Sequence, residues 1–365
     1  MKDKKEKIII ISIISLLVLG LALFFGYDYF KKDSQVTKEN NNANIKTEEE
    51  DNIDWNSYES SEIKDASNVE ITKGGVYTLS GTITGGVTIN TEEDVKLILN
   101  NVNIKNSKGP AIYVISANNT VIYLNEGTTN TVEDGSAYSG YDQDVNACIY
   151  SKDDLTFDGT GSLTVKANYQ DGIVSKDDLK IVNGTYSIKV NDDGIKGKDS
   201  VYILNGTFNI TAGGDGIKAS NDSDSEKGYV LIENGKFTIS AKSDGIQAIT
   251  KLVINNGTFD ITASEGLEAT YIVINDGDIN INASDDGINA STKSDFMTPT
   301  IEVNGGTINV TMGQGDTDGF DNNGNIYING GTVKVTGQST FDYDGEGKIN
   351  GGTVYVNGEK SIRTT

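Results

Sequence analysis

The stretch LVINNGTFDITASEGLEA, from Leu252 to Ala269, decides the fold. An Asn-Gly pair and an acidic-Gly pair separate its three short runs of alternating apolar residues. This pattern predicts three strands and two tight corners, not a helix. Similar units begin at Asn183, Asn205 and Asn234. We interpret each unit as one coil of a β-solenoid, because stacked coils bury a core that no single coil could bury alone.

The period of the repeat follows from its second glycine corner. This corner recurs at steps of 22, 22, 29, 21, 21 and 32 residues, at Gly172, Gly194, Gly216, Gly245, Gly266, Gly287 and Gly319. The two long steps contain the stretches 221–228 and 291–299, which we interpret as loop insertions. The sequence therefore predicts an all-β solenoid with about 22 residues and three short strands per coil.

Composition limits the possible functions. The chain has 365 residues, 42 of them Gly and only 8% aromatic, which suits a long and narrow core. The formal charge of -23 argues against nucleic acid as a partner. The single cysteine, Cys148, agrees with an exported chain that has no intramolecular disulfide.

The N-terminal segment predicts membrane attachment. Four Lys lie within residues 1–7, and a long apolar run follows. We expect a cytoplasmic tail (1–7), a single-pass transmembrane signal anchor (8–30), a disordered linker (31–61) and an extracellular solenoid domain (62–365). The alternative is a cleaved signal peptide, but the apolar run is longer than usual and no A-x-A site follows. We interpret Trp55 as packing on the first coil; a ligand contact is the alternative.

The inward side chains follow from the two-residue period of a strand. They form three apolar stacks, as a parallel solenoid requires. The stack after Asn-Gly contains Tyr186, Phe208, Phe237, Phe259, Ile279, Ile308, Val333 and Val354; the stack before it contains Ile181, Ile203, Ile232, Ile254, Ile274, Val303 and Ile328; the stack after the acidic corner contains Ile173, Ile195, Ile217, Ile246, Leu267, Ile288 and Phe320. Asn183, Asn205, Asn234 and Asn256 are expected to form a ladder of stacked amides at their corner.

Two outward-facing surfaces of the predicted strands are candidates for binding. Tyr202, Leu231, Val253 and Val273 would form an exposed apolar patch, which marks either a covering loop or an interaction site. The polar faces of the strands at 207–211, 236–240, 258–262 and 307–311 are rich in hydroxyl groups. These faces suit either ordinary solvation or hydrogen bonding to a polysaccharide.

The acidic corner carries the most chemistry. Equivalent positions on neighbouring coils stand about 4.8 Å apart, so a file of carboxylates repels itself. Calcium, which prefers oxygen ligands, would relieve this repulsion. Lys196 and Lys218 could neutralise part of the file instead, or Asp-Gly could simply make a turn. The candidate calcium ligands are Asp171, Asp192, Asp193, Asp215, Asp244, Glu265, Asp285, Asp286, Asp316 and Asp318.

Candidates for catalysis are few. The chain has no His, and its single Arg is Arg363. A Lys base beside calcium-bound Asp is the remaining arrangement, with Lys196 or Lys218 near Asp193 and Asp215. We therefore expect a protein that is not an enzyme, with a calcium-dependent polysaccharide lyase as the alternative.

Several runs together resemble the clostridial carbohydrate-binding β-helix family. They are GGVYTLSGTITGGVTIN (74–90), NNVNIKNSKGPAIYV (100–114), EGTTNTVEDG (126–135), NACIYSKDDLTFDGTGSLTV (146–165) and KGYVLIENGKFTI (227–239). The resemblance covers about residues 68 to 365. It implies a right-handed single-stranded parallel β-helix that binds calcium, attaches to cellulose or polygalacturonate, and is similar in fold to pectate lyases. Family members often look like lipoproteins, whereas this chain has an apolar anchor and no lipobox.

The charge and the resemblance agree on one expectation. A strongly acidic surface repels polygalacturonate unless divalent cations bridge the two. We expect a monomeric cell-surface protein that binds plant cell-wall polysaccharide through calcium without cleaving it. Lys196 and Lys218 are further candidate glycan contacts. A neutral glucan would need exposed aromatics such as Tyr202 and Tyr327, and its binding would survive chelation. A structural stalk or adhesin is the other alternative.

Overall fold

The computed structural model describes residues 53–315 and 317–361, and these residues contain no α-helix. The predicted tail, the anchor and linker residues 31–52 lie outside the described residues. Within the described part, no helix is long and apolar enough to cross a membrane. Ordered structure begins before the predicted boundary at 62, with a 3₁₀ helix, η2 (Trp55–Ser57), and the strand β1 (Ser60–Ala66). This early order has a physical reason, because β1 pairs with β3 (Gly75–Ile83).

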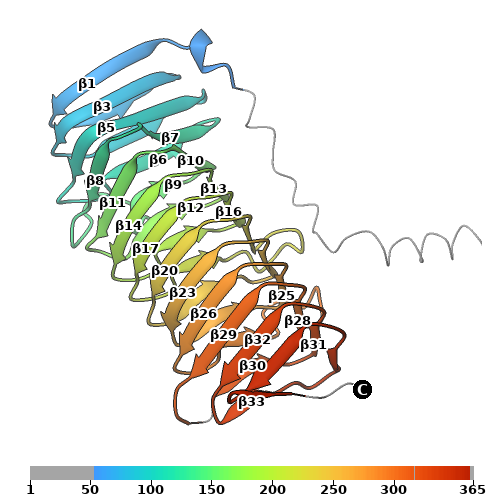
Figure 1. Cartoon of the computed structure of the whole chain (residues 1–365). Helices are drawn as coiled ribbons and strands as arrows, with labels where there is room; N and C mark the ends of the chain where they lie inside the picture. Colours follow the sequence, from blue (N-terminus) through green and yellow to red (C-terminus); the bar gives the residue numbers. More distant parts are fainter. Residues whose placement is uncertain (1–52, 316, 362–365) are drawn as a thin grey trace, which may run out of the picture. The chain divides into compact units, whose positions relative to one another are not determined.

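The strands form two hydrogen-bonded sheets that run along one solenoid (Figure 1). The smaller sheet has 12 parallel strands, one for each coil. They are β2 (Val69–Ile71), β4 (Val87–Asn90), β6 (Ile112–Ser116), β9 (Ala147–Ser151), β12 (Asp171–Ser175), β15 (Ile195–Gly197), β18 (Ile217–Ala219), β21 (Asp244–Gln247), β24 (Glu265–Ala269), β27 (Ile288–Ala290), β30 (Asp318–Asn322) and β33 (Ser339–Phe341).

The larger sheet has 24 strands. Near its beginning lie β1, β3, β5 (Val95–Lys105), β7 (Thr120–Leu124) and β8 (Thr129–Glu133). The strands before the Asn-Gly corner are β10 (Leu155–Gly159), β13 (Asp178–Ile181), β16 (Ser200–Ile203), β19 (Tyr229–Ile232), β22 (Lys251–Ile254), β25 (Tyr271–Ile274), β28 (Thr300–Val303), β31 (Asn325–Ile328) and β34 (Gly347–Ile349). Those after it are β11 (Ser162–Ala167), β14 (Thr185–Val190), β17 (Thr207–Thr211), β20 (Lys236–Ser240), β23 (Thr258–Ala263), β26 (Asp278–Ala283), β29 (Thr307–Met312), β32 (Thr332–Thr336), β35 (Thr353–Val356) and the short β36 (Glu359–Lys360).

The strand pairing confirms the predicted all-β solenoid with parallel strands. Each regular coil contributes three strands, and the described strands pair in parallel except at the end, where β36 pairs antiparallel with β35. The first coils are less regular, because β5 is one long strand that pairs with both β7 and β8. The right-handed winding stays a prediction.

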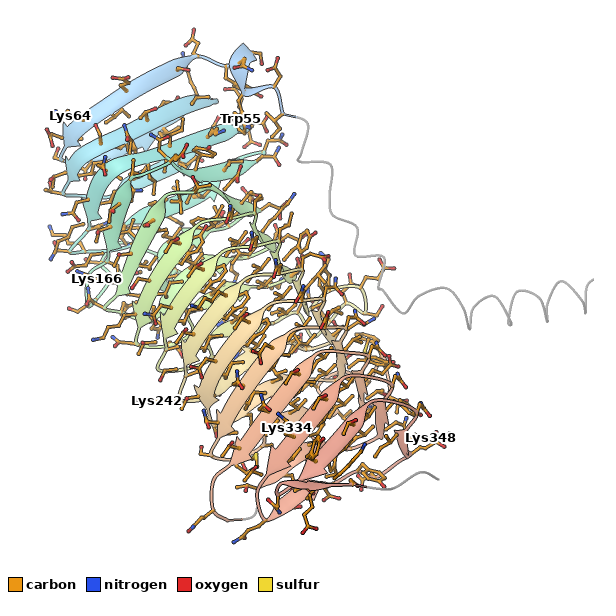
Figure 2. All side chains as sticks on the ribbon, viewed as in Figure 1. Trp55, Lys64, Lys166, Lys242, Lys334 and Lys348 are labelled. Carbon is orange, nitrogen blue, oxygen red and sulfur yellow. The ribbon has the colours of Figure 1, made fainter. Side chains whose placement is uncertain are left out.

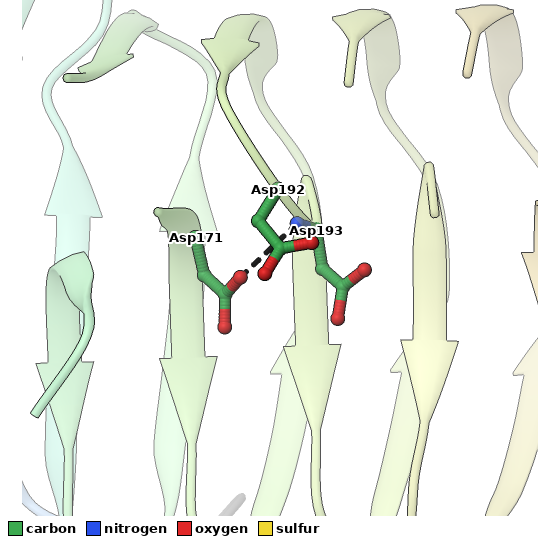
Figure 3. A group of neighbouring side chains, drawn as sticks. All are labelled: Asp171, Asp192 and Asp193. Atoms are coloured by element: carbon green, nitrogen blue, oxygen red, sulfur yellow. Dashed lines mark hydrogen bonds between the residues drawn. The ribbon is translucent and has the colours of Figure 1, made fainter. Parts of the chain in front are cut away.

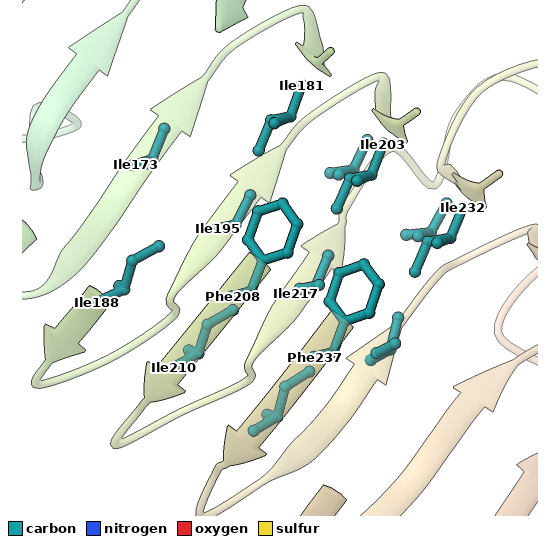
Figure 4. Close-up of a cluster of buried hydrophobic side chains, with 14 of the residues drawn as sticks. Ile173, Ile181, Ile188, Ile195, Ile203, Phe208, Ile210, Ile217, Ile232 and Phe237 are labelled. Carbon is teal, nitrogen blue, oxygen red and sulfur yellow. The ribbon is translucent and has the colours of Figure 1, made fainter. Parts of the chain in front are cut away.

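The three predicted apolar stacks are confirmed as the core. Every residue in them is at most 2% exposed. The aromatic rings of Tyr186, Phe208, Phe237 and Phe259 stack face to face, with centroids 5.0, 4.8 and 4.6 Å apart from one coil to the next. Figure 4 shows the isoleucines of the other two stacks pointing at this column. The core is therefore continuous along the solenoid.

Of the two alternatives for the apolar patch, an exposed interaction site is wrong. Leu231, Val253 and Val273 are only 6, 3 and 2% exposed, and Tyr202 is half-buried. The two-residue period gives the direction of a side chain but not its exposure, which depends on what stands beside it. Here long side chains share the same strands, and the Lys251 ammonium lies 5.4 Å from the centre of the Tyr271 ring. The polar faces behave as predicted, since the side chains of β17 and β20 alternate between exposed and buried.

The asparagine ladder exists, but one residue earlier than predicted and on later coils. Its side-chain amides bond in sequence from coil to coil at 2.7–2.9 Å, through Asn255, Asn275, Asn304, Asn329 and Asn350. Of the predicted residues, Asn183 and Asn256 accept a bond from the backbone N–H of the following glycine. An asparagine that bonds to its own corner is not available to bond to the next coil.

Surface side chains surround the solenoid on the described coils. Figure 2 shows Lys64, Lys166, Lys242 and Lys334 distributed along it, and all four are exposed. The Trp55 ring lies at 43° to the Tyr58 ring, with ring centres 5.4 Å apart, and the Lys96 ammonium lies 5.8 Å from the centre of the Trp55 ring. These contacts with an early coil agree with the packing role expected for Trp55.

Candidate functional site

The acidic corner lies at the start of the strands of the 12-stranded sheet, where glycine lets neighbouring coils approach closely. A Cβ added at Gly245 would lie 2.5 Å from the carbonyl oxygen of Gly266. The same clash would occur at Gly172, with the carbonyl oxygen of Gly194. Glycine after the acid therefore brings successive carboxylates into direct contact with the next coil.

The corner aspartates form hydrogen bonds from coil to coil. Asp171 Oδ1 accepts a bond of 3.0 Å from the backbone N–H of Asp193 (Figure 3). Asp193 and Asp215 accept equivalent bonds of 2.9 Å from the backbone of Asp215 and Asp244. Asp286 accepts one of 2.9 Å from Asp318. One oxygen of each carboxylate thus satisfies a buried backbone donor, which is a structural reason for aspartate at this position.

Lysines neutralise the first part of the file. Lys196 Nζ lies 2.8 Å from Asp193 Oδ2 and 3.6 Å from Asp171 Oδ2. Lys218 pairs with Asp215 and lies 3.9 Å from Asp193 Oδ2. Asp171, Asp192 and Asp193 form a compact group of carboxylates (Figure 3). Two ammonium groups, those of Lys196 and Lys218, already lie 2.8 and 3.9 Å from Asp193 Oδ2, so this group fits a divalent cation poorly.

The pKa shifts agree with these contacts. Burial would raise the pKa of Asp215, but the Lys218 ammonium outweighs it and holds that pKa below its usual value. Burial raises the pKa of Asp171 to about 6 against the opposing effect of Lys196. Burial would also lower the pKa values of Lys196 and Lys218, yet the surrounding carboxylates raise both. Both lysines are therefore held in their charged form.

The residues in register with Lys196 change in charge from coil to coil along the solenoid. Strand register places one residue per coil in this column, in the order Lys196, Lys218, Gln247, Glu268, Asn289 and Asp321. The column therefore changes from two cations, through an amide, to an anion beside the corner acids.

Where the lysines end, three carboxylates meet. Oxygen atoms of Asp244, Glu265 and Glu268 all lie within 4.8 Å of one another, and Asp244 and Glu268 are buried. The Gln247 amide donates to Asp244 and, at 2.9 Å, to Glu268. Lys293, from the inserted stretch 291–299, lies 2.7 Å from Glu268. One ammonium group thus faces three carboxylates, which we call the carboxylate cluster.

The carboxylate cluster resists ionisation in the absence of a cation. Burial raises the pKa of Glu265 to about 7, and the charges of Glu268 and Asp286 add to the shift. Burial also raises the pKa of Asp244, and the neighbouring Glu268 and Asp215 add to that shift. Burial is the main cause of both shifts, and the neighbouring carboxylates add to them.

An unpaired acceptor lies beside the cluster. Asn289 is 8% exposed, and its amide nitrogen donates to Glu265 at 3.0 Å. Within the described residues, its buried Oδ1 has no hydrogen-bond partner. Its amide nitrogen therefore contacts the cluster, and its oxygen is a buried acceptor on the same side chain. Three carboxylates beside the single ammonium group of Lys293, together with this amide oxygen, form a set that suits a hard cation such as Ca²⁺.

The other predicted ligands lie further along or outside. Asp285 is exposed, and Asp286 is half-buried with its pKa raised to about 6 by burial. Asp318 has a buried oxygen for which no partner is found in the described part of the chain. Asp316 lies outside the described residues. The structure therefore places Asp244 and Glu265, of the ten predicted ligands, in the carboxylate cluster.

The four predicted carbohydrate contacts are not brought together. Tyr202 on β16 and Tyr327 on β31 lie in the 24-stranded sheet, with β19, β22, β25 and β28 between them. Lys196 and Lys218 lie in the 12-stranded sheet and face aspartates. The hydroxyl of Tyr327 donates to Glu346 at 3.2 Å. These four residues do not form one binding surface.

Sequence reasoning missed Glu268, although a signal was present. The corner reads DGIK at Lys196 and Lys218, DGIQ at Gln247 and EGLE at Glu268. Comparing the fourth position of this unit across coils would have shown the change from lysine to glutamate.

The fold and this corner define a parallel β-solenoid with a buried cluster of oxygen ligands. The family described as "Carbohydrate-binding domain-containing protein" matches residues 65–319 and 269–363. Together these ranges cover well over half of the chain. The chain belongs to this family.

Two relatives show the extent of the likeness. A carbohydrate-binding domain-containing protein of Acetivibrio thermocellus is 42% identical over 145 residues, which are 38% of this chain and 49% of that protein. The match thus spans about half the length of this curated relative. A solved polysaccharide lyase-like protein from C. thermocellum, a gadolinium derivative, is 37% identical with a TM-score of 0.55. That match covers 60% of this chain and 96% of the solved one.

Proposed function

We propose that this protein binds acidic polysaccharide at the cell surface through calcium held by the carboxylate cluster, and that it does not cleave the polysaccharide. The observation that carries the proposal is the meeting of Asp244, Glu265 and Glu268 with a single ammonium group and an unpaired Asn289 oxygen. The likeness to carbohydrate-binding proteins supports the substrate class.

The residues of the cluster fit a calcium ion. Asp244, Glu265 and Glu268 would supply carboxylate oxygens, and Asn289 would supply an amide oxygen. A bound calcium ion would offset their charge and offer positive charge to a glycan carboxylate. The protein's own part is to hold these oxygens in place through the Gln247 amide and the coil-to-coil spacing.

Charge supports an acidic glycan only if a cation is present. The chain carries a formal charge of -23, which repels an acidic polymer at long range. A divalent cation between two carboxylate-rich surfaces reverses that repulsion locally.

The lysines support binding without cleavage. A lysine acts as a general base only when its pKa falls toward neutrality. Carboxylates raise the pKa values of both Lys196 and Lys218, so neither is suited to remove a proton from a sugar carbon. A lyase would need a base that these two residues do not provide.

The apolar run at residues 8–30 supports membrane attachment. We place the solenoid outside the cell on a single-pass anchor, preceded by a lysine-rich tail. Fractionation followed by protease treatment of intact cells tests this. Degradation of the solenoid from outside supports the proposal, and a protected cytoplasmic solenoid contradicts it.

The binding proposal is tested by retention of the full-length protein on insoluble polygalacturonate. Retention is expected with calcium and is expected to be lost in chelator, and metal analysis should find calcium in the bound protein. Equal retention with calcium and with chelator would contradict the proposal. Unsaturated products released with calcium would instead favour the lyase alternative. Absence of any retention, with calcium affecting stability alone, would favour a structural stalk or adhesin.

A further inference from the structure

A second pocket lies on the opposite half of the 12-stranded sheet from the carboxylate cluster. The loop between β8 and β9, residues 134–146, lies against the earlier coils, where Ser139 N–H donates to the Lys108 carbonyl at 2.9 Å. Between this loop and the strands β4 and β6 lies a cavity of about 510 Å³. Its lining includes Thr88, Tyr113, Ile115, Tyr141, Asp142 and Lys152.

The aromatic walls of the pocket are held in place before any ligand arrives. The Tyr113 ring lies 5.7 Å from the Tyr141 ring at 67° and 6.0 Å from the Tyr150 ring. The Tyr141 hydroxyl accepts a bond of 3.4 Å from the Asn106 amide. A Cβ added at Gly109 would lie 2.1 Å from the Tyr141 ring, so this ring lies directly against the backbone. A ring fixed in this way loses little entropy on binding.

The accessible ring of the pocket is Tyr141. Tyr113 is only 8% exposed and belongs to a buried cluster with Val145 and Tyr150. Tyr138 lies against Tyr169, with ring centroids 4.5 Å apart, and its hydroxyl donates to Asp134 at 2.7 Å. Tyr141 lies against Tyr113 and Tyr138 but stays half-buried and lines the cavity. The pocket therefore presents one partly accessible aromatic ring.

The charges in the pocket balance. Lys152 Nζ lies 3.2 Å from Asp142 Oδ2, and both side chains remain partly accessible. The ion pair offers donors and acceptors but no net charge. A pyranose has an apolar C–H face that packs on aromatic rings and a rim of hydroxyls that hydrogen-bond to charged groups. A neutral sugar fits these features better than a uronate, whose carboxylate would compete with Asp142 for Lys152.

We propose that this pocket binds one neutral pyranose unit of a glycan without a metal ion. The sugar packs on Tyr141, and its hydroxyls bond to Asp142 and Lys152. The inference rests on the proposed function in polysaccharide binding and gives the protein a second, cation-independent contact. It also places neutral-sugar binding at Tyr141 and not at Tyr202 or Tyr327.

Titration calorimetry of the full-length protein with cellohexaose in chelator tests the site. Tyr141→Ala is expected to weaken binding at least about tenfold, and Tyr141→Phe, which keeps the ring, less than about threefold. Tyr355→Ala, on β35 in the other sheet, serves as the matched control and should leave the affinity unchanged. Retained affinity in Tyr141→Phe shows that the pocket is folded.

The outcomes separate this inference from the proposed function. The proposal that the pocket binds a sugar would be contradicted if the unaltered protein did not bind cellohexaose, or if Tyr141→Ala bound it with equal affinity. Calcium-dependent retention on polygalacturonate would still stand in that case. Loss of cellohexaose binding on chelation would also overturn it, because the site is argued to need no cation. Cellohexaose binding without polygalacturonate retention would remove the proposed function and leave the pocket.

Discussion

At the scale of the residue, the side chain at one position of the corner unit decides between an ion pair and a site for a cation. Lys196 and Lys218 neutralise their neighbouring aspartates, whereas Glu268 adds a third carboxylate to Asp244 and Glu265. Sequence reasoning identified the corner acids, because they recur at the coil period. It could not say which of these acids would form a cation site, because that depends on the residue at the Lys196 position of each coil and on Lys293 from the inserted stretch.

Replacing one carboxylate of the cluster tests the calcium site. Glu265→Gln removes a charge but keeps an acceptor for the Asn289 amide. We expect calcium affinity, measured by titration calorimetry, to fall at least about tenfold, because affinity depends on the number of charged ligands. The control is Asp260→Asn, which removes an exposed acid from the same coil. Equal calcium affinity in Glu265→Gln and the unaltered protein would contradict the site.

Removing Lys218 tests whether ion pairs stabilise the corner aspartates on the earlier coils. Lys218→Met leaves Asp215 buried without its cation, whereas Asp193 keeps Lys196 at 2.8 Å. We expect the free energy of unfolding to fall by about 3 kcal/mol, the order seen when one partner of a buried pair is lost. Denaturant titration followed by circular dichroism measures the change. Lys236→Met, an exposed lysine on β20, should cost far less. A similar small effect in both variants would show that the pairing is not important for stability.

At the scale of the element, each strand is stable only through the strands above and below it. The three inward stacks followed correctly from the two-residue period, since burial of alternate residues is what a parallel solenoid demands. The asparagine ladder was displaced by one residue, because the period does not say whether an amide bonds to its own corner or to the next coil. The apolar residues Leu231, Val253 and Val273 were expected to be exposed, but they are buried. The alternation of residues along a strand gives the direction of a side chain and not the side chains that cover it.

The stacked aromatic rings are expected to contribute strongly to stability. Phe237 is stacked between Phe208 and Phe259 and is 1% exposed. We expect Phe237→Ala to lower the free energy of unfolding by about 3–5 kcal/mol, because it leaves a cavity that touches three coils. Thr238→Ala changes the exposed next residue of the same strand and should have an effect within about 0.5 kcal/mol. Comparable losses in the two variants would contradict a continuous core.

At the scale of the whole molecule, the surplus of buried carboxylates couples stability to pH. In chelator the folded protein holds protons on Glu265, whose pKa is about 7, that the unfolded chain releases near pH 4. Stability contributed by this group is therefore present below about pH 4 and is lost as pH rises toward about 7. Glu268 and Asp286 add to the effect, and Lys293 opposes it.

Thermal unfolding in chelator at several pH values checks this coupling. Between about pH 5 and pH 8 the melting temperature of the unaltered protein should fall more steeply than that of Glu265→Gln, since the variant has no proton to lose at this position. Added calcium should raise the melting temperature most at pH 8, where the carboxylates are ionised. Parallel pH profiles for the two proteins would contradict the assigned shift.

The changing column beside the corner has a consequence for direction. Nearly identical coils would make both directions along the solenoid equivalent for a linear ligand. The row Lys196, Lys218, Gln247, Glu268, Asn289 and Asp321 removes that equivalence, because it begins with two basic residues and its two acidic residues lie in its second half. An acidic chain lying along this sheet would meet ammonium groups first and cation-bridged carboxylates afterwards. Such a chain would therefore be attracted at the lysine end of the row and, without a cation, repelled at the carboxylate end.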